Sequence, residues 1–242
     1  MTSYAQRRSA SLALGPIDLR NLLPADVRAQ GPRPLCLPFS VSVAHEAARS
    51  MASSVAPEDL AVEPLWQHCV NTGLASHEGT TLQAVIGAAL DTGQTIDTVW
   101  PYNDTLGSGT EHTPAGATAG SFNTAEIFAI PLAHDGVEQL IESTLAVGLP
   151  VVLILEVTAQ LETPDADGEI YTPPLSAPVG DYHAVTAVGA ATSPDGTSRR
   201  FLIRNSWGPG WGAGGHGWLP YDYLVNFAGQ AVAIDPTTLA TR

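Results

Sequence analysis

Three short segments, far apart in the chain, each carry a residue type that acyl transfer by a thiol requires. Cys36 stands six residues after Gln30, His183 opens an apolar run that ends at Gly189, and Asn205 opens the run Asn-Ser-Trp-Gly. A thiol nucleophile needs a base within hydrogen-bond reach and a third group that orients the base. Cys36, His183 and Asn205 supply these types in that order. Their combination predicts a cysteine-nucleophile site.

Each residue also has a simpler structural explanation. A cysteine can be a buried small hydrophobe, a strand histidine can merely satisfy its hydrogen bonds, and an asparagine in a glycine-rich loop can be a turn residue. Gln30 can be a surface glutamine, or its amide can donate to the oxyanion that forms during acyl transfer. The order of Gln30, Cys36, His183 and Asn205, with Trp207 placed to shield the imidazole–amide bond, favours the catalytic interpretation.

Together these segments resemble the papain-like cysteine peptidases. That family has a glutamine six residues before its nucleophile, an aromatic–serine pair after it, and a histidine followed by Ala-Val. Its asparagine motif, Asn-Ser-Trp-Gly-x-Gly-Trp-Gly, is matched without a gap from Asn205 to Gly212. The resemblance covers roughly residues 16–224. It implies an α+β fold in which a helical lobe packs against an antiparallel barrel-like lobe, with the active site in the cleft between them.

The resemblance also implies substrate-binding positions. Gly79 corresponds to a glycine whose backbone pairs with extended substrate, although a glycine at the start of a helix is an equal alternative. Tyr182 and Trp207, beside the histidine and asparagine, are the other expected contacts. No metal or cofactor is expected, because the acidic run 165–169 lacks the spacing of a calcium loop.

The nucleophile segment departs from the family pattern. The usual Gly-Ser-Cys-Trp is Pro34-Leu35-Cys36-Leu37 here, which changes the walls around the thiol. The resemblance begins near Pro16, so we expect no inhibitory pro-segment. Both features favour a peptidase of restricted specificity, for peptide maturation or processing. The alternatives are a transpeptidase or peptide ligase, in which an amine resolves the acyl-enzyme, and a catalytically dead peptide-binding protein.

The segment after Cys36 has helical periodicity, with Pro38 where a first helical turn tolerates proline. A helix N-terminus and a neighbouring imidazolium both favour a thiolate. The sequence therefore predicts a thiolate–imidazolium pair. In such a pair the pKa of Cys36 lies below the ~8.5 of a free thiol, and that of His183 lies above ~6.5.

Composition limits the possible partners. The chain has 242 residues, is 44% hydrophobic and carries a net charge of −14, with ten basic residues that are all arginine. Such a chain lacks the basic surface that nucleic acids or anionic membranes require. No segment approaches the ~20 apolar residues of a membrane span, and the apolar run after Arg7-Arg8 is too short for a signal peptide. We expect a bacterial, cytoplasmic protein with a peptide or protein substrate.

The two cysteines agree with that compartment. The family's usual disulfide starts three residues before the nucleophile, at a position that is Arg33 here, and Cys69 resembles its partner. We therefore expect Cys69 to be a free thiol, as in proteins of reducing compartments.

Helical and strand patterns divide the chain. Helices are predicted over 39–52, 60–70, 80–91 and 137–146, and strands over 151–157, 168–171, 183–189, 201–204 and 217–220. The expected organisation is a flexible N-terminus (1–15), one catalytic domain (16–225) and a C-terminal tail (226–242). Within the domain, the helical lobe spans 31–130 and the β lobe spans 16–30 and 131–225.

Overall fold

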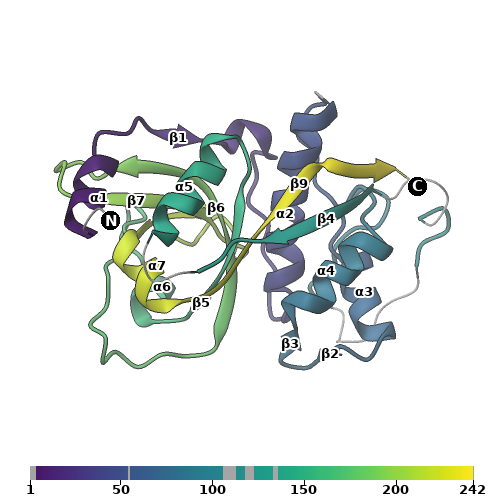
Figure 1. The fold of residues 1–242 in the computed structure, drawn as a ribbon. Coiled ribbons are helices and arrows are strands. Elements are labelled where there is room, and N and C mark those ends of the chain that lie inside the picture. The colour runs from purple at the N-terminus through teal and green to yellow at the C-terminus, as the bar shows by residue number, and fades with distance from the viewer. Residues whose placement is uncertain (1–3, 54, 106–112, 118–122, 133–135, 242) are drawn as a thin grey trace.

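A computed structural model describes residues 4–53, 55–105, 113–117, 123–132 and 136–241. Helices α2, α3 and α4 gather on one side, and most of the sheet lies on the other side with α5, α6 and α7 (Figure 1). The predicted α+β class with two lobes is confirmed. Two further helices, α1 (Tyr4–Ser11) and the 3₁₀ helix η1 (Arg20–Leu22), lie in the N-terminal segment.

Helix α2 (Cys36–Ser53) is the central helix of the helical lobe, and most of its side chains are buried. Around it lie α3 (Glu63–Asn71), α4 (Leu82–Asp91) and a hairpin of β2 (Ala75–Ser76) and β3 (Gly79–Thr80). Helix α4 begins after Thr81, whose side chain accepts a hydrogen bond from the amide of Ala84. The three helices predicted in this half are confirmed, with α3 starting three residues later than expected.

The main sheet is antiparallel, with the strand order β4-β9-β5-β6-β7-β8 and with β1 (Ile17–Asp18) also paired to β6. Four consecutive strands in this order are β5 (Val151–Glu156), β6 (Tyr182–Thr192), β7 (Arg199–Arg204) and β8 (His216–Pro220). Helices α5 (Val137–Ala146), α6 (Ala159–Glu162) and α7 (Tyr221–Phe227) accompany it. Across the described strands, the hydrogen-bonded path is open, with β4 and β8 at its ends.

The C-terminal segment corrects one expectation. Residues 226–242 were expected to be a tail, but β9 (Ala228–Thr241) lies inside the sheet between β4 (Asn123–Ala129) and β5. Alternate residues of β9 pack into different cores: Ala231 and Ala233 pack with the sheet-side cluster, and Val232 and Ile234 with the cluster around α2. Because successive side chains of a strand point to opposite faces, β9 joins the two lobes.

A second correction concerns residues 168–171. They form no strand, and Glu169 makes only an isolated bridge to Trp218.

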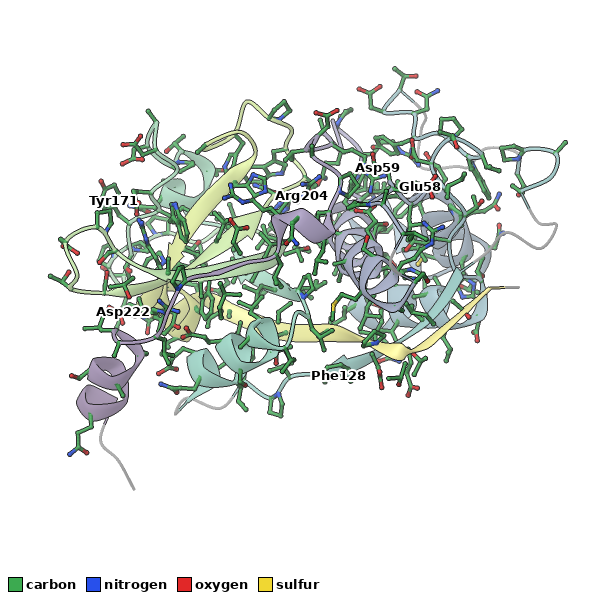
Figure 2. All side chains as sticks on the ribbon, turned by 90° about the horizontal axis from the view of Figure 1, so that it is seen from above. Glu58, Asp59, Phe128, Tyr171, Arg204 and Asp222 are labelled. Carbon is green, nitrogen blue, oxygen red and sulfur yellow. The ribbon has the colours of Figure 1, made fainter. Side chains whose placement is uncertain are left out.

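Polar contacts also tie the N-terminal segment to the sheet. The guanidinium of Arg204, near the middle of the molecule in Figure 2, donates to the carbonyl oxygens of Pro24 and Asp26. These bonds fix the segment that leads to Gln30. None of the described helices combines the length and apolar character that crossing a bilayer requires.

Candidate active site

A cleft of about 860 Å³ separates the two groups of elements that carry the predicted nucleophile and base. Its helical side contains Cys36, at the first residue of α2, and its sheet side contains His183, the second residue of β6. The lining residues are Pro34, Cys36, Leu37, 77–82, Ile154, 181–184, Gly229 and Gln230. The structure thus brings Cys36 and His183 to one cavity from positions far apart in the chain.

Cys36 is a free, half-buried thiol. Burial raises its pKa above the usual value, and backbone hydrogen bonds from Ala184 and Leu37 oppose that shift only in part. The sequence predicts a lowered pKa from the helix N-terminus and an imidazolium. The direction differs because burial, which a sequence pattern does not reveal, penalises a lone thiolate more than its backbone hydrogen bonds stabilise it.

His183 is fixed by Asn205. Its Nε2 lies 2.7 Å from Oδ1 of Asn205, and the same oxygen accepts the backbone N–H of Ser206 at 2.8 Å. An oxygen can only accept, so Nε2 carries a hydrogen and Nδ1 is the nitrogen left for proton exchange. The ring of Trp207 lies with its centroid 4.4 Å from that of His183 and covers the imidazole.

His183 is only 6% exposed. Burial lowers the pKa of His183 to about 4, and the bond to Asn205 opposes this shift. Burial therefore disfavours a charge on Cys36 alone and a charge on His183 alone. The neutral pair and the ion pair carry the same number of protons, so moving a proton from Sγ to Nδ1 creates both charges together, and their attraction offsets the burial penalty.

Gln30 is 8% exposed and is not among the residues that line the cleft. Its Oε1 accepts the hydroxyl of Ser206 at 2.6 Å, and its Nε2 donates to the carbonyl oxygen of Arg33 at 2.8 Å. These two partners fix which end of the amide is nitrogen. An amide nitrogen carries two hydrogens, so one N–H remains for a further acceptor.

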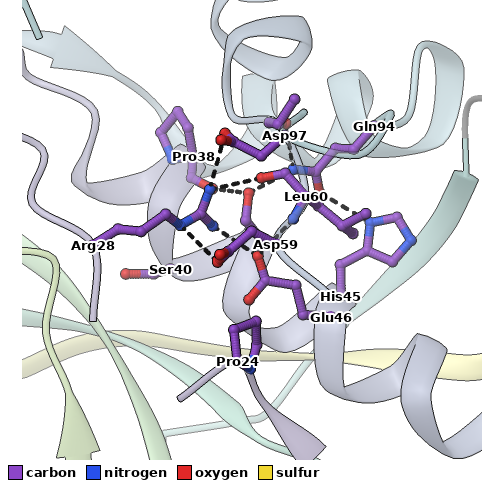
Figure 3. Close-up of polar contacts among 12 residues, drawn as sticks. Pro24, Arg28, Pro38, Ser40, His45, Glu46, Asp59, Leu60, Gln94 and Asp97 are labelled. Carbon is purple, nitrogen blue, oxygen red and sulfur yellow. Dashed lines mark hydrogen bonds and ion pairs between the residues drawn. The ribbon is translucent and has the colours of Figure 1, made fainter. Parts of the chain in front are cut away.

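The segment before Gln30 is held by Arg28 (Figure 3). The Arg28 guanidinium contacts Oε1 of Glu46 on α2 at 2.7 Å and forms ion pairs with Asp59 and Asp97. It also donates to the carbonyl oxygen of Leu60 at 2.8 Å. Burial raises the pKa of Glu46 to about 7, although Arg28 opposes the shift. The segment that carries Gln30 is thereby tied to the helix that carries Cys36.

The three expected substrate contacts have different surroundings. Gly79 lies in the β2–β3 hairpin and lines the cleft, with a φ of 128° that favours glycine. Tyr182 also lines the cleft, is exposed, and donates its hydroxyl to Glu156. Trp207 is not among the lining residues and contacts His183 instead.

Sequence patterns missed several cleft residues. Ile154 on β5 and Gly229 and Gln230 on β9 line the sheet side, and His77 and Glu78 line the hairpin side. The continuous apolar run at 231–234 is the sequence signal for β9, which the expected tail does not take into account.

Comparisons with known proteins agree with this geometry. The sequence model of the papain family cysteine proteases matches residues 17–231. Among solved structures, xylellain, a cysteine protease from Xylella fastidiosa, is 24% identical with a TM-score of 0.68, covering 94% of this chain and 89% of that one. The search of curated proteins gives no match.

Two plant proteins, both solved with the inhibitor E-64, have similar folds. The Carica candamarcensis protease CMS1MS2 is 21% identical with a TM-score of 0.70, covering 90% of this chain and 97% of that one. Bromelain from Ananas comosus is 17% identical with a TM-score of 0.72, covering 92% of this chain and 99% of that one.

Proposed function

This chain belongs to the papain family of cysteine proteases, and from that membership we propose which of its residues act and on what kind of peptide. The protein is a cysteine-type peptidase. We assign Cys36 as nucleophile, His183 as general base and acid, Asn205 as the residue that orients His183, and Gln30 as oxyanion donor. The observation that carries the assignment is that Cys36 and His183 line one cleft while Asn205 holds Nε2 of His183.

In the first half-reaction, Nδ1 of His183 takes the proton of Cys36, and Sγ attacks the carbonyl carbon of the peptide bond. The carbonyl oxygen gains negative charge, which the side-chain amide of Gln30 and the backbone amide of Cys36 stabilise. When the C–N bond breaks, the leaving nitrogen takes the proton from Nδ1. The product is a thioester between the acyl group and Sγ.

In the second half-reaction, water attacks the thioester carbonyl and gives one proton to Nδ1 of His183. The C–S bond breaks, and Sγ leaves as a thiolate paired with the imidazolium. Asn205 acts in both steps because it keeps the ring in the orientation and tautomer that direct Nδ1 to the nucleophile.

We further propose a restricted specificity, as in peptide maturation or processing. Leu35 is fully buried and Pro34 and Leu37 line the cleft, where the family pattern has smaller or aromatic residues. The described lining contains Glu78 and Asp181 but neither lysine nor arginine. With a net charge of −14 for the whole chain, this cleft favours peptides with basic side chains near the cleaved bond.

The test is digestion of an unbiased peptide library, read by mass spectrometry, with Cys36→Ala as the blank. We expect cleavage that depends on Cys36 and is confined to a narrow set of sequences enriched in lysine and arginine. Equal cleavage by Cys36→Ala would refute the proposed nucleophile. Product masses with and without an added amine distinguish hydrolysis from peptide ligation.

We also propose that the protein works in the bacterial cytoplasm. Both cysteines are free thiols, and Cys69 is fully buried in the helical lobe. A chain that needs no disulfide suits a reducing compartment. Separating the cell fractions of its source organism and detecting the protein by antibody tests the location.

A further inference from the structure

We propose that the buried ion pair of Arg33 and Glu63 is a positioning device for the oxyanion donor Gln30. The inference rests on the proposed role of Gln30. Arg33 is 4% exposed and Glu63 is 1% exposed. Nη2 of Arg33 lies 3.0 Å from Oε2 of Glu63, and Nη1 contacts Oε1, so the pair is bidentate. Nη1 also donates to the carbonyl oxygen of Asn103 at 2.9 Å.

Arg33 reaches Gln30 by two routes. Its own carbonyl oxygen accepts a hydrogen bond from Nε2 of Gln30 at 2.8 Å. The position of the Arg33 backbone therefore orients the side-chain amide of Gln30. Its guanidinium carbon lies 5.1 Å from the ring centroid of Tyr102, whose hydroxyl donates to the carbonyl oxygen of Gln30. Arg33 itself therefore holds the side chain of Gln30, and Tyr102, which Arg33 contacts, holds its backbone.

Stability alone does not explain this arrangement. A buried ion pair costs so much desolvation that apolar residues of similar size often stabilise a fold equally well. Its bidentate geometry does fix the position of the backbone that carries it. Position is what an oxyanion donor requires, since a displacement of about 1 Å can cost about 10²-fold in rate.

The pair also links the loop of Arg33 to helix α3. In the resembling family, the position of Arg33 starts a disulfide whose usual partner corresponds to Cys69. Here Glu63 lies at the start of α3, the helix that carries Cys69, while Cys69 is a free thiol. The Arg33–Glu63 pair thus joins the same loop to the same helix without dependence on redox conditions.

The test compares reactions that need the oxyanion donor with one that does not. A peptide aldehyde adds to Sγ and places negative charge on its former carbonyl oxygen, whereas alkylation of Cys36 by iodoacetamide forms no oxyanion. For Arg33→Met we expect kcat to fall about 10- to 100-fold and the aldehyde Ki to rise by a similar factor. KM and the alkylation rate should stay within about threefold. Arg33→Lys keeps the charge without the bidentate fork, so its kcat and aldehyde Ki should lie between those of the wild type and Arg33→Met.

Arg199→Met is the matched control, because Arg199 forms an equally buried ion pair with Glu142 in the sheet lobe. It should change thermal stability without the selective loss of aldehyde binding. Glu63→Gln, which keeps an amide acceptor for Arg33, serves if Arg33→Met fails to fold. A parallel fall in aldehyde binding and alkylation in every folded variant would overturn the proposal.

Gln30→Ala separates this proposal from the one on which it rests. If Gln30→Ala weakens aldehyde binding and Arg33→Met does not, Gln30 is the donor and the positioning role is wrong. If Gln30→Ala has no effect, the assignment of Gln30 fails and the positioning role fails with it. The double variant should lose no more than Gln30→Ala alone, since both changes remove the same interaction.

Discussion

Oδ1 of Asn205 accepts two hydrogen bonds at once, from Nε2 of His183 at 2.7 Å and from the backbone of Ser206 at 2.8 Å. The second bond fixes the amide so that its oxygen, and not its nitrogen, faces the imidazole. The tautomer of His183 is therefore set by the backbone of the loop after β7. A change at Asn205 acts on the imidazole without touching Cys36.

Asn205→Ala should lower kcat about 10²-fold, because the imidazole loses the partner that keeps Nδ1 aimed at Sγ. KM should change little, since Asn205 is not a lining residue of the cleft. Steady-state kinetics on a peptide substrate measures both values. Asn226→Ala, at an exposed position on α7, is the control and should behave as wild type. An equal loss in both variants would contradict the assigned role.

Asp181→Asn should reduce kcat/KM for peptides with a basic residue near the cleaved bond about fivefold, as an exposed charge contact contributes about 1 kcal/mol. Neutral peptides should be unaffected. The difference should shrink at ~1 M salt, where the Debye length is about 3 Å. Glu126→Gln, on the exposed face of β4, changes the net charge equally and should leave the preference intact. A loss in both variants would indicate general attraction by the chain.

The two cysteines should be distinguishable by reagent. In the native protein a disulfide reagent should modify Cys36, which lines the cleft, and leave Cys69, which is fully buried. After denaturation without reductant, two thiols should react, and Cys36→Ala should show one. No reactive thiol in the denatured wild-type protein would mean that the cysteines form a disulfide.

Local patterns predicted the parts of this site whose structure is local. The helix that begins at Cys36 and the strand that carries His183 could be predicted because helical periodicity and apolar runs depend on residues that are close in sequence. The place of β9 depends on pairing with β5, far away in sequence, and no short pattern encodes such pairing. The Arg33–Glu63 pair was missed for the same reason, because a charged residue in a loop gives no sign of its partner.

The directions of the pKa shifts of Cys36 and His183 could not be predicted from the sequence, for a different reason. Motifs identify the neighbours of Cys36 and His183, which favour charge. They do not reveal how completely the folded chain excludes water from both groups, and exclusion of water dominates for each one. The same holds for the neighbours His45 and Glu46 on α2, which burial shifts in opposite directions.

His45 and Glu46 should give opposite pH dependences of stability. The pKa of His45 falls from 6.5 to about 4, so its unfolded form binds the proton more tightly, and stability is lost as pH falls from about 6.5 towards 4. The pKa of Glu46 rises from 4.5 to about 7, so its contribution is lost as pH rises through that window. Each shift corresponds to about 3 kcal/mol.

Urea unfolding at several pH values tests this pair. His45→Gln should weaken the loss of stability in acid, and Glu46→Gln should weaken the loss between pH 4.5 and 7. Each variant is the control for the other. Identical pH slopes in both variants and the wild type would show that neither group titrates differently on folding.

The pH profile of Cys36 alkylation should reveal whether the two buried groups ionise together. Burial disfavours either charge alone, so the pair keeps one proton over a wide range and the reactive ion pair is a constant fraction of it. The alkylation rate should therefore be constant from mildly acidic to neutral pH. It should fall only as pH approaches about 4, where His183 is protonated while Cys36 keeps its own proton.

His183→Ala removes the group that accepts the thiol proton. The thiolate must then form alone in a buried site, where burial raises its pKa above the ordinary thiol value, so the alkylation rate should rise only in alkali. The wild-type and His183→Ala profiles should thus differ most between pH 5 and 8, by about 10²-fold or more. If the wild-type rate also rises only in alkali, the proton does not move to His183, and the neutral pair is the resting form that substrate must convert. Iodoacetamide rates measured at constant ionic strength across pH 4–10 decide between the two.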